Sequence, residues 1–155
     1  MMGLDSIDRA ILMALQRDGR LSNVVLADEV GLSESACLRR VKILEKTGII
    51  DKYTMLVDQT VAGKPGNVFV QITLERQTKE ELATFEAAVR RVPEVMECYL
   101  MTGEFDYLLR VVVPDLEAYE HFLLEHLTRI KGIASIKSSF SLKQVCYKTT
   151  LPLPH

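Results

Sequence analysis

Hydrophobic residues in the first third of the chain recur at spacings of three and four, the period of one helix face. The first run predicts a helix that begins after Asp5 and ends near Gly19. Its apolar stripe consists of Leu4, Ile7, Ile11 and Leu15. A second, shorter helix fits residues 23–30, with Ser22 or Asn23 as its N-cap.

Gly31 stops this pattern, and a third helix is expected from about residue 34 to residue 47, with Ser33 as its N-cap. Residues 49–57 then look extended and rich in β-forming side chains, which predicts a strand. Three helices followed by a strand are typical of a winged-helix-like, helix-turn-helix domain.

The hydrophobic period changes to two in the second half of the chain. Alternation predicts a strand over residues 67–75, and a helix follows between a capping box at Thr78 and Glu81 and the terminating Pro93. Further elements are expected in the order strand, strand, helix, strand, over residues 95–102, 106–113, 116–130 and 133–147.

This order, βαββαβ, folds as a four-stranded antiparallel sheet with both helices on one face, the ferredoxin-like arrangement. The fold class is therefore α+β. The other face of such a sheet is bare, so we expect another subunit to cover it.

The stretch DQTVAGKPGN lacks apolar periodicity and contains glycine, proline and asparagine, which indicates a linker. The expected organisation is a helix-turn-helix domain, a linker, a ferredoxin-like domain and a C-terminal tail. Their bounds are residues 1–60, 61–66, 67–147 and 148–155.

The connection VGLS between the second and third helices suggests a helix-turn-helix. Ala27, four residues before Gly31, suits a close approach of the two helices. In the third helix, Cys37, Val41 and Leu44 share one face, and the opposite face carries Ser35, Arg39, Lys42 and Lys46.

A cationic face behind a core face is what a helix in the DNA major groove requires. Arg39 can pair two donors with a guanine edge, while Lys and Ser mostly hold phosphates. Arg40 lies nearer the core edge, where a backbone or structural role is expected. The residues expected to contact DNA are Ser22, Asn23, Ser33, Ser35, Arg39, Arg40, Lys42 and Lys46.

The charge that would attract DNA is local, because the whole chain is slightly acidic, with 19 Lys and Arg against 21 Asp and Glu. Residues 31–53 carry five basic and three acidic side chains. The alternative is a solvated helix in which Glu34 and Glu45 form intrahelical ion pairs.

The chain resembles the Lrp/AsnC, or feast/famine, transcriptional regulators. The segments LDSIDRAILMALQRDGR, LSESACLRRVKILEKTGII and TGEFDYLLRV carry the resemblance, which extends from Leu4 to about Pro152. Two small departures are residues 34–36, where the family often has a proline, and Cys146, where a basic residue is common.

The resemblance implies a DNA-binding homodimer that assembles further, often to an octamer, through the ferredoxin-like domain. It also implies that a free amino acid, bound between dimers, alters assembly or DNA affinity. No other cofactor is implied.

The hairpin YLMTGEFDYLL is the expected effector loop. A glycine at its turn exposes backbone N–H groups to a carboxylate, and Asp106 could accept an α-ammonium group. Carried over from the family, the effector residues are Leu100, Met101, Thr102, Gly103, Asp106 and Tyr107, with Ser138 from a neighbouring subunit. The alternative is that Gly103 only makes a turn, with Asp106 as its cap.

Enzymatic and metal-binding functions find little support. Glu104 and Asp106 lie near each other without a histidine or lysine motif, and His121 and His126 are five residues apart on a helix rather than four. A metabolite-binding or assembly module, and an enzyme acting on an amino acid, stay as alternatives.

Three widely spaced cysteines without a CxxC pattern indicate reduced, buried thiols. The sequence shows neither a signal peptide nor a membrane span, so a cytoplasmic protein is expected.

Overall fold

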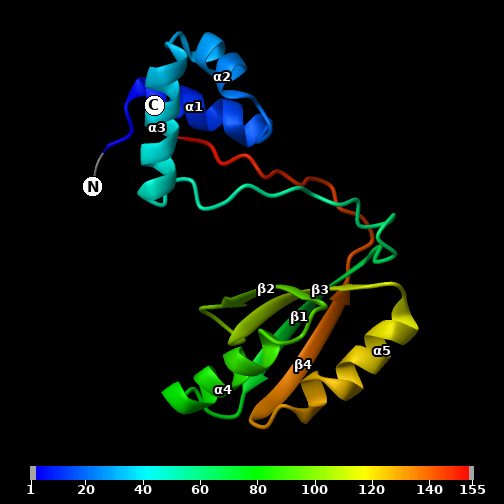
Figure 1. Ribbon diagram of the computed structural model, residues 1–155. Coiled ribbons are helices and arrows are strands. Elements are labelled where there is room, and N and C mark those ends of the chain that lie inside the picture. Colours follow the sequence, from blue (N-terminus) through cyan, green and yellow to red (C-terminus); the bar gives the residue numbers. More distant parts are fainter. Residues whose placement is uncertain (1–2, 154–155) are drawn as a thin grey trace. The chain divides into compact units, whose positions relative to one another are not determined.

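Three helices, α1 (Ser6–Arg17), α2 (Asn23–Val30) and α3 (Glu34–Lys46), form the first part of the chain (Figure 1). The computed structural model describes residues 3–153. The chain divides into two compact units, one containing residues up to Leu56 together with those from Val145 onward, and the other Val57–Gln144.

Each helix of the first unit begins at the N-cap that its sequence predicts. The Asp5 carboxylate accepts from the Asp8 N–H at 2.8 Å, and Ser22 and Ser33 accept from the N–H groups of Val25 and Ala36, each at 3.3 Å. These bonds satisfy N–H groups that a helix leaves free in its first turn. The three helices enclose a small core of Ile11, Leu12, Ala14, Leu26, Ala27, Cys37 and Leu44.

The predicted strand at residues 49–57 is absent, since the described chain has no strand between α3 and Gly66. A strand exists only where another strand pairs with it, and this segment has no such partner among the described residues. Its side chains are also largely exposed, with Met55 79% and Leu56 62% accessible.

The second unit has the expected βαββαβ order. Its elements are β1 (Gly66–Leu74), α4 (Lys79–Val89), β2 (Val95–Leu100), β3 (Tyr107–Val113), α5 (Leu116–Glu125), a 3-10 turn (Leu127–Arg129) and β4 (Ile133–Phe140). The four strands pair antiparallel in the order β2-β3-β1-β4. The ferredoxin-like prediction is confirmed.

Alternation along the strands puts both helices on one face of this sheet (Figure 1). Val70 of β1 and Leu109 of β3 are paired and fully buried, and they pack with Phe85 of α4 and Phe122 of α5. Within the described residues no helix covers the other face, where Phe69 and Tyr99 are 38% and 53% exposed.

The last strand is shorter than predicted, because β4 ends at Phe140 rather than at residue 147. Its partner β1 begins at Gly66, so pairing stops soon after Phe140 meets Val68. Residues 145–153, here called the C-terminal segment, have no secondary structure and belong to the first unit, where Leu153 packs against the helical core.

The cysteines only partly follow expectation. Cys37 is buried and its burial raises the pKa of the thiol, whereas Cys98 and Cys146 are exposed, so the prediction of buried thiols is wrong for these two. None of the described helices is both long and apolar enough to span a bilayer.

Candidate nucleic-acid interface and effector loop

The turn between α2 and α3 sets the direction of α3. Gly31 adopts the left-handed conformation, with φ 70° and ψ 36°, which glycine reaches without strain. The Leu32 N–H then donates to the Ala27 carbonyl at 2.9 Å and closes α2. Asn23 joins the two helices, because its side-chain amide donates to the Glu34 carbonyl at 2.8 Å.

One face of α3 is buried and the opposite face is cationic. Cys37 and Leu44 are 0% and 2% exposed, and they anchor the helix in the core. The opposite face is exposed and consists of Ser35, Arg39, Lys42 and Lys46. Within residues 3–153 the three cations of this face form no ion pair. We call these four residues the α3 cationic face.

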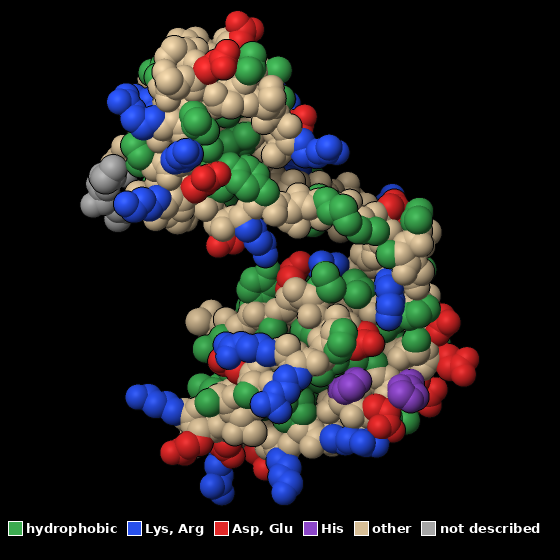
Figure 2. All heavy atoms as spheres, in the orientation of Figure 1, with side chains coloured by type: hydrophobic (Ala, Val, Ile, Leu, Met, Phe, Trp, Pro, Cys, Tyr) green, Lys and Arg blue, Asp and Glu red, His purple; other side chains and the backbone are tan. Residues whose placement is uncertain are grey.

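The space-filling view agrees with this arrangement. On the side of the first unit that α3 occupies, Figure 2 shows separate Lys and Arg side chains with hydrophobic side chains between them. Cations without protein partners are available for phosphates or guanine edges.

Arg40 differs from its neighbours because it is engaged inside the unit. Its guanidinium contacts Asp5 at 2.7 Å and Asp8 at 2.8 Å, and its side chain is 30% exposed. The Asp8 backbone N–H, followed by Arg40, lowers the pKa of Asp5. The geometry favours the structural role that the sequence suggested, and it gives no support to a DNA contact by Arg40.

The small polar residues at the helix starts have their side-chain acceptors occupied by capping bonds. Ser22 and Ser33 accept from backbone N–H groups, and Ser33 lies 3.4 Å from the hydroxyl of Ser35. Their hydroxyl groups still offer a donor to phosphate, whereas the amide of Asn23 is used between α2 and α3.

The expected effector loop is the β2–β3 hairpin. Thr102, Gly103 and Glu104 are exposed at its tip, where Gly103 has φ 120°. The Met101 N–H donates to the Asp106 carbonyl at 2.8 Å, which closes the hairpin. Leu100, 60% exposed, and Met101, 37% exposed, give the loop an apolar border.

Asp106 ties this hairpin to the end of β1. Its Oδ2 accepts from the Leu74 N–H at 2.7 Å and from the Gln77 amide at 3.3 Å. One carboxylate oxygen is thus used in the fold, in keeping with the alternative of a capping role. The other oxygen makes no hydrogen bond within residues 3–153 and can still face an ammonium group.

Two further expected effector residues, Tyr107 and Ser138, form hydrogen bonds with the helices of the second unit. The Tyr107 side chain is 1% exposed, and its hydroxyl donates to Glu86 of α4 at 2.9 Å, so it points into the core rather than to the loop surface. Strand alternation decides this, since Tyr107 pairs with Ile72 on the helix-covered face. Ser138 is hydrogen-bonded to Tyr119 of α5, and its contact with a neighbouring subunit's effector stays a prediction.

Two features were missed by the sequence analysis. The first is the exposure of Leu38, which is 43% accessible beside the α3 cationic face. Helical periodicity could have predicted this position, since Leu38 does not share the face of Cys37 and Leu44. The contact of the C-terminal segment with α1 had no local signal, because its partners are more than a hundred residues apart.

Comparisons with known proteins cover both units. Residues 4–45 match the model of the AsnC-type helix-turn-helix domain, and residues 67–151 match that of the Lrp/AsnC ligand binding domain. Together these two matches span most of the chain.

Named relatives have similar lengths. The Bkd operon transcriptional regulator of Pseudomonas aeruginosa is 49% identical over 150 residues, covering 97% of this chain and 98% of the relative. The leucine-responsive regulatory protein of Escherichia coli is 44% identical over 142 residues, covering 92% of this chain and 87% of the relative. A solved structure, a Neisseria meningitidis transcriptional regulator in complex with L-Met, has a TM-score of 0.92 and 41% identity, with 97% of each chain covered.

Proposed function

Because the chain belongs to the Lrp/AsnC family of transcriptional regulators, we propose that its α3 cationic face reads duplex DNA and that its β2–β3 hairpin senses a free amino acid. The family consists of regulators rather than enzymes, and the chain has both a DNA-binding helix-turn-helix and a ligand-binding domain.

The observation that carries the DNA proposal is the α3 cationic face. Arg39, Lys42 and Lys46 are exposed and lack protein partners in the described chain, while buried Cys37 and Leu44 hold the helix from behind. Arg39, in the N-terminal half of α3, is placed to reach base edges, and the two lysines bind phosphates.

The amino-acid proposal is supported by the chemistry of the hairpin. Gly103, with a φ of 120°, forms a turn at which backbone N–H groups can receive a carboxylate, and the free oxygen of Asp106 suits an ammonium group. Leu100 and Met101 supply apolar surface for an apolar side chain. A solved relative at 41% identity is an L-Met complex, and another relative is described as leucine-responsive.

The bare face of the sheet suggests a homodimer. Phe69 and Tyr99 are exposed there, and Arg110 is paired with Glu97 at 2.9 Å, which gives the surface an apolar part and a polar part. A second copy that covers this face would form a dimer, and dimers would assemble further, to the octamer that the family resemblance implies.

The mechanism is linkage between effector and assembly. An amino acid that binds one assembly state more tightly shifts the population towards it. The number of α3 helices that engage neighbouring DNA sites then changes, and with it the avidity. Such a regulator acts where the chromosome is, so we propose a cytoplasmic location.

The test is fluorescence anisotropy of labelled DNA from immediately upstream of the protein's own gene, against scrambled DNA, at low and moderate salt. Wild type should prefer the upstream DNA with a steep salt dependence, and Arg39→Ala should lose that preference. A panel of free amino acids in the same assay should change the affinity. No DNA binding at any salt, with and without amino acids, would instead favour an assembly or metabolite-binding module.

A further inference from the structure

Leu38 is an exposed apolar side chain next to a charged surface. It is 43% exposed, although it lies in the middle of a well-formed helix between buried Cys37 and cationic Arg39. Leaving part of a leucine in water forfeits the free energy of its burial, so a surface that fits it would gain from contact.

Helical geometry places Leu38 at one edge of the α3 cationic face. At 100° per residue it lies about 40° from Lys42 and about 60° from Ser35 around the helix axis. A duplex that binds these polar residues therefore meets Leu38 in the same groove.

The other exposed apolar residue beside this face, Ile43, has a different environment. It is also 43% exposed, but it lies about 140° from Leu38. It lines a hollow of about 310 Å³ together with Leu4, Leu44 and Ile49, and Arg39 and Arg40 also line this hollow. Leu38 is five residues nearer the N-terminal end of α3, the end that contacts base edges in helix-turn-helix proteins.

The major groove displays one apolar group, the C5-methyl of thymine. We propose that Leu38 packs on a thymine methyl and sets a preference for an A·T pair at the position it faces. This A·T preference would add to the base preference set by the hydrogen bonds of Arg39 to base edges. This inference rests on the α3 cationic face being the DNA-reading surface, as proposed above.

The experiment removes the methyl group alone. Binding sequences for wild type are selected from a random duplex library, and each selected thymine is then replaced by deoxyuridine, which lacks only that methyl. At one thymine position, this replacement should lower the affinity of wild type for the duplex about fourfold, which corresponds to the free energy of burying one methyl-sized group.

The variants Leu38→Ala and Leu38→Gln should bind thymine and deoxyuridine probes with equal affinity at that position. Ile43→Ala is the matched control, with equal exposure on the same helix, and should keep the full fourfold difference. Thermal unfolding of each variant separates a lost contact from a lost fold, and Leu38→Gln keeps a good helix former in place.

Three results would overturn the inference. In the first, Leu38→Ala still binds thymine more tightly than deoxyuridine. In the second, replacing thymine by deoxyuridine lowers the affinity of wild type at no position. In the third, Leu38→Ala changes the oligomeric state, which would make Leu38 a contact between subunits. If no sequence were selected and the affinity for DNA did not change with salt, the DNA proposal itself would be overturned. Sequence-selective binding without methyl dependence would overturn only the role of Leu38.

Discussion

Two hydrogen bonds join Gln16 of α1 to Leu151 of the C-terminal segment, although these residues are 135 positions apart in the chain. The Leu151 N–H donates to Gln16 Oε1 at 2.6 Å, and Gln16 Nε2 donates to the Leu151 carbonyl at 3.2 Å. One side-chain amide thus pairs with both backbone groups of one residue, as a neighbouring strand would. The chain that leaves the sheet returns to the helical unit.

Removing this contact should destabilise the helical unit. We expect Gln16→Ala to lower its free energy of unfolding by about 1 kcal/mol, since both hydrogen bonds are lost at an exposed site. Leu153→Ala should have a similar effect, because Leu153 packs partly buried on the helical core. Urea unfolding followed by circular dichroism measures both.

The control for this prediction is Gln144→Ala, at an exposed glutamine with no side-chain hydrogen bond among the described residues. Equal stability of the Gln16 variant and wild type would mean that the C-terminal segment does not hold α1 in solution.

Neutralising the α3 cationic face should reduce the salt dependence of DNA binding. Lys42→Ala and Lys46→Ala should each lower the slope of log affinity against log salt by about 0.9 if each lysine neutralises one phosphate. Affinity should fall on all sequences alike, whereas Arg39→Ala should also relax base preference. Anisotropy titrations over a salt series provide the slopes.

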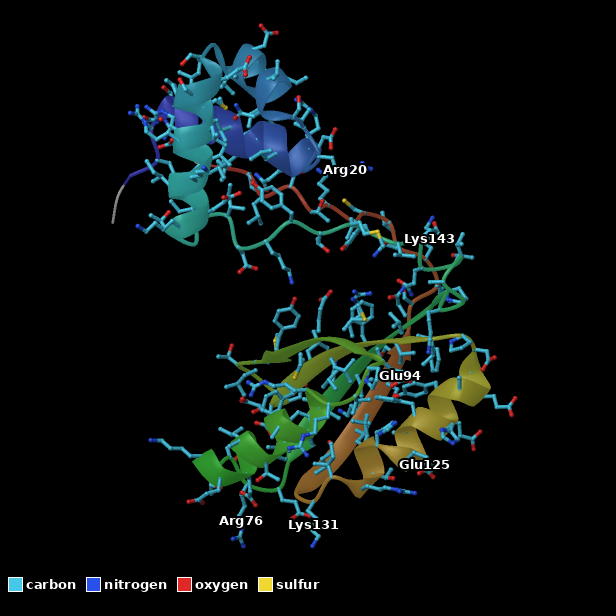
Figure 3. All side chains as sticks on the ribbon, in the orientation of Figure 1. Arg20, Arg76, Glu94, Glu125, Lys131 and Lys143 are labelled. Atoms are coloured by element: carbon cyan, nitrogen blue, oxygen red, sulfur yellow. The ribbon has the colours of Figure 1, made fainter. Side chains whose placement is uncertain are left out.

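Lys131→Ala is the matched control, because Lys131 extends into solvent from the turn before β4 (Figure 3). An unchanged slope in both Lys42→Ala and Lys46→Ala would contradict phosphate contacts by these lysines.

The ion pairs of Arg40 should make the helical unit sensitive to acid. The pKa of Asp5 is lowered in the folded state, from an ordinary value of 3.8, by the Asp8 N–H and by Arg40. Its contribution to stability is therefore complete above about 3.8 and is lost as pH falls through the lower folded pKa. Arg40→Ala should melt at a lower temperature than wild type near neutral pH.

The two melting temperatures should converge as the pH falls below 3.8. Below its melting temperature, Arg40→Ala should bind DNA much as wild type does, because Arg40 acts within the protein. A loss of DNA affinity in fully folded Arg40→Ala would instead assign Arg40 a direct DNA contact.

Two substitutions at Asp106 should separate its structural role from its proposed ligand role. Asp106→Ala removes the acceptor of the Leu74 N–H and should cost about 1–2 kcal/mol in unfolding free energy. Asp106→Asn keeps an acceptor but removes the charge, so it should stay folded and lose the response to amino acids. Calorimetric unfolding and DNA anisotropy with the amino-acid panel measure the two effects.

If Asp106→Asn kept the full amino-acid response, the ammonium group would have to bind elsewhere. Glu104→Gln, at the exposed tip of the same hairpin, is the control for a general effect of lost charge.

Gly103 should be required for the shape of the hairpin. Its φ of 120° is one that other residues rarely adopt, although a Cβ there would meet no atom within 4 Å. Gly103→Ala should therefore cost about 1–3 kcal/mol through backbone strain alone. Equal thermal stability of the variant and wild type would mean that the loop relaxes to another turn.

Features that depend on a few neighbouring residues were predictable from the sequence. The caps at Asp5, Ser22 and Ser33 and the glycine turn at Gly31 all form where expected, because their hydrogen bonds close within three to five residues. Alternation likewise predicted the strand β1, since side chains of a strand alternate by geometry between a buried and an exposed face.

Features that need a distant partner were decided by the tertiary structure. The segment 49–57 has β-forming residues but no strand to pair with among the described residues, and the C-terminal segment gains its place from Gln16. Arg40 is drawn to Asp5 and Asp8 across the helical unit, and Tyr107 is turned into the core towards Glu86. The sequence by itself determined the elements and their capped ends, because these obey local geometry. Only the folded chain decided which polar groups remain free to bind, because that depends on every partner within reach.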